Sequence, residues 1–148
     1  SLTEGKHKFF TGKVSMRSKA RECAFKIIFA SLFRPDAELQ RNIYKTFDLT
    51  EEERAYADRL LDCVAMHRDE LTEELNSKSV GFSDKRMFPV DKSLLLMALA
   101  EIRYFDDVPN VVAIDEAVGL AKRYSTEKSV GYVNGVLAAC IAGGDTKA

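Results

Sequence analysis

The residues of this sequence most able to do chemistry are the basic side chains gathered near its beginning. Residues 1–26 contain seven lysines or arginines and only two acids, a net charge of +5. The remaining residues contain 15 basic and 21 acidic side chains, a net charge of −6, so the whole chain carries −1. A basic segment on an acidic body is typical of proteins that contact nucleic-acid phosphates, although a solvated tail has the same charge pattern.

Three of these side chains, Arg17, Lys19 and Arg21, fall in the first turns of a segment with helical spacing. Side chains that neutralise phosphates release counterions, so binding through them weakens as the salt concentration rises. We predict that these three residues contact phosphates together with Lys13. Three basic residues near the other end of the chain are expected to extend the same track: Lys122, Arg123 and Lys128.

Other residue types that support catalysis or metal binding lack partners at a useful spacing. Cys23, Cys63 and Cys140 lie far apart in apolar stretches and are expected to be reduced, unpaired core thiols. His7 and His67 have no second histidine or cysteine at ligand spacing, so we expect no metal and no cofactor. Phosphate-binding glycine loops, dinucleotide fingerprints and nucleophile elbows are also missing, and the sequence predicts no enzyme.

The clustered acids have a structural explanation. Thr50 is followed by Glu51, Glu52 and Glu53, the pattern of a capping box at a helix start, where the helix dipole favours negative charge. The adjacent pairs at 106–107 and 115–116 point to different sides of a helix and have no base at matching spacing. We therefore expect these acids to take no part in catalysis.

Apolar residues recur with helical spacing in nearly every segment, and no alternating pattern with a hairpin turn occurs. This predicts an all-α fold of six to eight helices without a sheet. The expected helices run from about Arg17 to Phe33, from Asp36 to Phe47, from Thr50 onward, through Leu71 and Leu75 to Gly81, from an Asp91 cap through Leu94–Ala100, from Pro109 and Asn110 onward, and from Thr126 to Ile141. Gly131 and Gly135 suggest close packing of the last helix against a neighbour.

The length of 148 residues fits one domain, and 46% apolar content is enough for a core. We expect a flexible basic arm at residues 1–16, a single helical domain at 17–142 and a tail at 143–148. No run of 18 apolar residues and no signal-peptide pattern occurs, so the sequence predicts a cytoplasmic protein.

Three motifs, in order, resemble those of the NusB family of transcription antitermination proteins. Residues Ala20–Ala24 resemble its A-R-E-x-A opening, and Tyr132–Leu137 resemble F-V-N-G-V-L. Residues Val108–Val118, with the following Leu120–Lys122, resemble V-P-x-x-V-A-I-N-E-A-V-x-L-A-K. The chain departs from the family pattern at Asp115, where asparagine is usual, at Ala100, where tyrosine is common, and in a weaker run of N-terminal arginines.

This resemblance implies a fold of seven helices in two packed three-helix bundles. It implies binding of boxA-type single-stranded RNA through the basic N-terminal motif, together with the ribosomal protein called NusE. It further implies action with other Nus factors and RNA polymerase to support ribosomal RNA transcription. Two alternatives stay open: an RNA-binding accessory domain related to those of RNA methyltransferases, and a pure protein-interaction module, which would lack salt-dependent RNA binding.

A partner surface is predicted in the segment from Asp84 to Asp107, which mixes charged and aromatic side chains as interfaces do. Ordinary core packing explains the same aromatic residues equally well. The candidate partner-binding residues are Met87, Phe88, Arg103, Tyr104 and Phe105.

Overall fold

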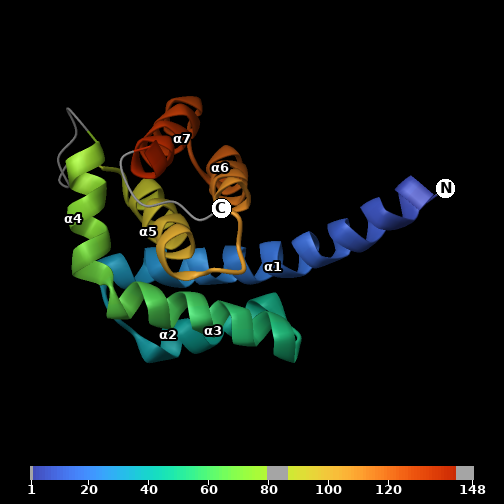
Figure 1. Cartoon of the computed structure of the whole chain (residues 1–148). Helices are drawn as coiled ribbons and strands as arrows, with labels where there is room; N and C mark the ends of the chain where they lie inside the picture. Colours follow the sequence, from blue (N-terminus) through green and yellow to red (C-terminus); the bar gives the residue numbers. More distant parts are fainter. Residues whose placement is uncertain (1, 80–86, 143–148) are drawn as a thin grey trace.

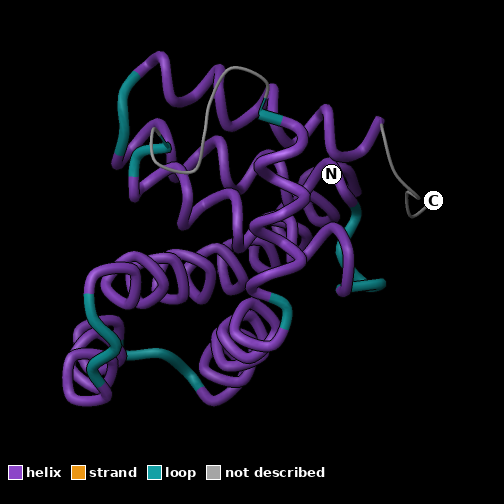
Figure 2. The backbone as a smooth tube through the Cα atoms, turned by 90° about the vertical axis from the view of Figure 1, so that its left-hand side faces the viewer, coloured by secondary structure: helices purple, strands orange, loops and turns teal. Residues whose placement is uncertain are grey.

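The computed structural model describes the backbone of residues 2–79 and 87–142, and the side chains of residues 17–79 and 87–142. Within these ranges the chain forms seven α-helices and no strand, which confirms the predicted all-α class (Figures 1 and 2). The helices are α1 (Leu2–Phe33), α2 (Ala37–Phe47), α3 (Glu51–Met66), α4 (Arg68–Lys78), α5 (Pro89–Tyr104), α6 (Asn110–Tyr124) and α7 (Glu127–Ala142). The expected end at Gly81 lies outside the described residues.

Local signals in the sequence account for most helix ends. The Asp36 carboxylate accepts hydrogen bonds from the backbone N–H groups of Glu38 and Leu39, which caps α2. The Thr50 hydroxyl accepts from the Glu53 N–H at 3.2 Å, while the Glu53 carboxylate accepts from the Thr50 N–H at 2.8 Å. The predicted capping box at the start of α3 is therefore confirmed.

Helices α1 and α5 begin elsewhere than predicted. The helical backbone of α1 extends back to Leu2, so the expected start at Arg17 is wrong, and Figure 1 shows this first part of α1 projecting beyond the other helices. In α5 the N-cap is Phe88 and the first helical residue is Pro89, whose fixed φ suits that position. The predicted cap, Asp91, is instead 2% exposed inside the first turn.

The core is built around α5, in which every residue from Ser93 to Ile102 is buried. Helices α5, α6 and α7 pack against one another, and α1 packs against α2 and α3. Helices α1 and α3 also contact α5, which joins the two groups, while α4 packs against α5 and α7 (Figure 1). The two groups of three helices follow the expected arrangement, with α4 covering one end.

The glycines of α7 do not mediate close packing. Gly131 and Gly135 are exposed, and a Cβ atom added at either position would meet nothing within 4 Å. The helix buries its opposite face, through Val133, Val136 and Leu137. The predicted close approach at these glycines is therefore wrong.

Candidate nucleic-acid interface

Arg17 and Lys19 of α1 project from different sides of the helix. Each helical residue turns by about 100°, so side chains two positions apart point in nearly opposite directions. Arg17 donates a hydrogen bond to Asp107 in the loop between α5 and α6, at 3.2 Å. Lys19 donates to the backbone carbonyl of Asp48, between α2 and α3, at 3.3 Å. The single track predicted for these residues is thus divided in two by α1 itself.

Arg21 lies in the core and cannot contact a phosphate from there. Its side chain is 1% exposed, and its Nε and Nη2 atoms each donate to the Glu101 carboxylate at 2.8 Å. The Tyr56 hydroxyl donates to the same carboxylate at 2.5 Å, and Glu116 lies 3.4 Å from the Arg21 Nη1 atom. Burial raises the pKa of Tyr56, which keeps the phenol protonated as a donor. The prediction that Arg21 contacts phosphates is therefore wrong in this conformation.

On the Lys19 side, a groove of about 550 Å³ lies between α1, the end of α2 and α6. Its lining consists of Ser18, Lys19, Glu22, Thr46, Phe47, Glu116, Gly119, Leu120 and Arg123. Gly119 leaves its part of the wall open, because a Cβ atom there would meet nothing within 4 Å. The groove combines two cations with an aromatic ring, the groups that bind single-stranded nucleic acid by charge and stacking.

Carboxylates hold the polar side chains of this groove in place. Arg123 donates to Glu22 at 2.5 Å, and the Tyr124 hydroxyl donates to the same carboxylate at 2.9 Å. The Ser18 hydroxyl donates to Glu116 at 2.5 Å. Arg123 nevertheless keeps 61% of its side chain exposed, so its remaining N–H groups are accessible to an anion.

Lys122, Arg123 and Lys128 lie around the corner between α6 and α7, and all three are exposed. Asp91 fixes this corner, since its carboxylate accepts from the hydroxyls of Ser125 at 3.1 Å and Ser129 at 2.8 Å. The structure thus brings Arg123 to the same groove as Lys19. Lys122 lies in the last turn of α6 and Lys128 in the first turn of α7, and neither lines the groove. The Lys13 side chain lies outside the described residues.

The opposite side of α1 carries a cluster that the sequence did not reveal. Arg59 of α3 donates to both oxygens of Asp107, at 3.0 and 3.3 Å, and Arg17 donates to the same carboxylate. The hydrogen bonds from Arg59 contribute most to lowering the pKa of Asp107 to about 2. Arg59 and Asp107 are 48 positions apart, and no spacing pattern in the sequence connects them.

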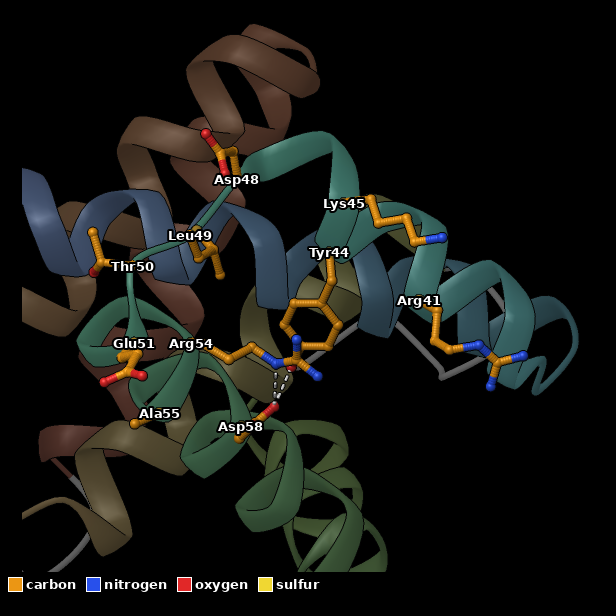
Figure 3. Close-up of a pocket in the computed structure, with 10 residues that line it drawn as sticks. All are labelled: Arg41, Tyr44, Lys45, Asp48, Leu49, Thr50, Glu51, Arg54, Ala55 and Asp58. Atoms are coloured by element: carbon orange, nitrogen blue, oxygen red, sulfur yellow. Dashed lines mark hydrogen bonds and ion pairs between the residues drawn. The ribbon is translucent and has the colours of Figure 1, made fainter.

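A second groove, of about 790 Å³, separates α2 from the start of α3 (Figure 3). The Arg54 guanidinium carbon lies 3.5 Å from the centroid of the Tyr44 ring, and both side chains bond Asp58. Figure 3 shows Arg41 and Lys45 pointing away from this stack. Three cations and three carboxylates line this groove, the same balance of charge as the two cations and two carboxylates of the Lys19 groove, so charge alone does not distinguish the two grooves.

The predicted partner-binding residues do not form one surface. Met87 and Phe105 are 7% and 1% exposed and belong to the core, so the interface predicted for them is wrong. Phe88 and Tyr104 are 63% and 38% exposed, but they lie at opposite ends of α5, about 24 Å apart at 1.5 Å per residue. Arg103 bonds Glu74 and the Cys140 carbonyl, which ties α5 to α4 and α7.

Tyr104 is held in a fixed orientation at the end of α5. Its ring stacks on His67 with the centroids 3.8 Å apart, and its hydroxyl donates to Glu70 at 2.9 Å. Burial and this hydrogen bond raise the pKa of Tyr104 to about 12. An interface role for Phe88 and Tyr104 stays a prediction.

Among the described residues, no three histidine, cysteine, aspartate or glutamate side chains lie so that they could hold a metal ion. The three cysteines form no disulfide; Cys23 and Cys140 are buried and Cys63 is half-buried. Within the described part of the chain, no helix is both long and apolar enough to cross a membrane.

Seven packed helices in the described part of the chain, with exposed cations beside open grooves, define an all-helical protein class. The NusB family model matches residues 18–142, and the chain belongs to the NusB family. The transcription antitermination protein NusB of Agathobacter rectalis is 40% identical over 126 residues, covering 82% of this chain and 96% of that protein.

Solved structures show the same fold. The structure of T. maritima NusB is 27% identical with a TM-score of 0.76, covering 85% of this chain and 90% of that chain. A crystal structure of the antitermination factors NusB and NusE in complex with double-stranded RNA has a chain that is 24% identical with a TM-score of 0.81. That match covers 88% of this chain and 98% of the other.

Proposed function

We propose that this chain is a transcription antitermination factor that binds RNA together with a protein partner of the NusE type. Its curated relatives are transcription antitermination proteins, and a solved structural neighbour is a complex of NusB and NusE with RNA. The observation in this chain that carries the proposal is the groove between α1, α2 and α6, where Lys19 and Arg123 face the same space beside Phe47.

In this function Lys19 and Arg123 bind phosphates, and Lys122, Lys128 and Lys13 extend the contact along the strand. Phosphate contacts position the RNA without reading its sequence, so boxA-type preference comes from contacts to unstacked bases. The groove supplies an aromatic ring, a hydroxyl and carboxylates for such contacts. The role requires binding and no catalysis, and it places the protein in the cytoplasm with the transcription machinery.

The test is an anisotropy titration of fluorescently labelled RNA with the purified chain, with and without a NusE-type ribosomal protein. We use a boxA-type single strand, a scrambled single strand and a duplex. The expected result is binding that weakens with salt, prefers the boxA-type strand and tightens when the ribosomal protein is present. Binding of the ribosomal protein without any RNA affinity, alone or in the complex, would identify a protein-interaction module instead.

A further inference from the structure

Arg17 and Arg59 approach the same carboxylate from two different helices. Their Nη2 atoms lie 3.2 and 3.0 Å from the oxygens of Asp107. The cluster carries one net positive charge, and the three side chains keep 34%, 45% and 46% of their surface exposed. It therefore differs from the Arg21–Glu101 pair beneath it, in which both side chains are 1% exposed.

Aromatic rings hold both guanidinium groups in place. The Arg59 guanidinium carbon lies 3.8 Å from the centroid of the Phe105 ring, and that of Arg17 lies 4.9 Å from the centroid of the Tyr56 ring. The two rings contact each other edge to face, with centroids 5.8 Å apart. The arginines therefore lose less side-chain freedom on binding an anion than two unsupported surface arginines would.

Most of the hydrogen-bonding capacity of these arginines is still free. Each guanidinium has five N–H donors in a planar fork that matches two oxygens of a carboxylate or phosphate. Arg17 donates once to Asp107 and Arg59 donates twice. The remaining donors of two guanidiniums fixed around one point suit an added anion.

We propose that Arg17 and Arg59 form a second phosphate-binding site, on the α3 side of α1, and that Asp107 limits its affinity. This inference rests on the proposed function, and its ligand is a phosphodiester of the bound RNA. Lys19 and Arg123 border the groove on the other side of α1, so an RNA that uses both sites passes around this helix. Asp107 keeps the arginines together in the free protein and competes with the phosphate for them.

Two substitutions with opposite expected effects test the site. Arg59→Gln should weaken binding of the boxA-type single strand about fivefold at 0.1 M salt and flatten the salt slope by about 0.7, the loss of one phosphate contact. Asp107→Asn removes the competing charge and should tighten binding about threefold or more. In the Arg17→Gln, Arg59→Gln double variant, Asp107→Asn should give only the small gain caused by the change in net charge.

Neighbouring and distant charges provide the controls. Asp106→Asn makes the same change in net charge next to the cluster, and Arg41→Gln removes an exposed arginine of α2. Asp106→Asn should change RNA affinity less than Asp107→Asn, and Arg41→Gln less than Arg59→Gln. Arg59→Lys keeps the positive charge, and its melting temperature shows whether the protein still folds when the guanidinium is replaced.

The outcomes separate this inference from the proposed function. If Arg59→Gln and Asp107→Asn lower the melting temperature but leave RNA affinity and salt slope at parental values, the cluster only ties α3 to the loop between α5 and α6. That result overturns the second site and leaves the Lys19–Arg123 groove in place. Failure of the parent chain to bind RNA overturns both.

Discussion

Removing one partner of the buried pair between Arg21 and Glu101 should destabilise the fold strongly. Glu101→Ala leaves the Arg21 guanidinium buried at 1% exposure without the carboxylate that accepts its Nε and Nη2 hydrogen bonds. Breaking a buried ion pair in this way costs about 3–5 kcal/mol. For a domain of this size, each kcal/mol lowers the melting temperature by roughly 2–4 °C, so a decrease of roughly 6–20 °C is expected.

The assay is urea unfolding monitored by circular dichroism, with the melting temperature as a second measurement. Arg34→Ala is the matched control, since Arg34 pairs with Asp36 at 82% side-chain exposure and an exposed pair contributes about 1 kcal/mol or less. The double variant Arg21→Met, Glu101→Met should recover much of the lost stability, because apolar residues of similar volume replace buried pairs at little cost. A loss below about 1 kcal/mol for Glu101→Ala would refute the assignment of this pair to the core.

Three further predictions concern the exposed residues. Lys19→Ala combined with Arg123→Ala should weaken RNA binding in an anisotropy titration by roughly 25-fold at about 0.1 M salt, the loss of two phosphate contacts, while changing the melting temperature little, since both side chains are largely exposed. Gly131→Ala and Gly135→Ala should each stabilise the protein by about 0.5–1 kcal/mol in urea unfolding, because both positions are helical with open space around them. Asp107 has a depressed pKa, so its contribution to stability is complete above its ordinary value near 3.9 and is lost as the pH falls toward about 2. Asp107→Asn should therefore reduce the acid-induced loss of stability in that range, and an unchanged acid profile would contradict the ion-pair geometry.

Local rules predicted the fold well because each rule involves residues close together in sequence. The capping box depends on Thr50 and Glu53 alone. The continuous run of apolar residues in α5 predicts a helix that is buried by other helices on all sides. The start of α5 was misplaced because Asp91, an effective N-cap residue, lies two positions after a proline that fits the first turn equally well. Its carboxylate bonds Ser125 and Ser129 instead, a contact that the spacing within α5 does not reveal.

The candidate site was harder to predict because a list of basic residues does not say which of them face the solvent. Arg123, Lys122 and Lys128 are exposed as expected, while Arg59 was missed because exposed arginines are common and its partners lie on other elements. Arg59 and Arg17 share the Asp107 carboxylate only because α3 packs against α1 and lies next to the loop between α5 and α6.

The burial of Arg21, in contrast, follows from the sequence once apolar faces are compared between helices. Arg21 lies between Ala20 and Ala24 on the buried stripe of α1, and Glu101 directly follows the apolar run of α5. An unpaired charge in a core is costly, so two opposite charges placed in two buried stripes must meet when those helices pack. Arg17, one turn earlier, bonds Asp107 in the loop between α5 and α6, and its side chain stays 34% exposed. The position of an arginine relative to the apolar stripe therefore distinguishes a core ion pair from a surface that is available to phosphate.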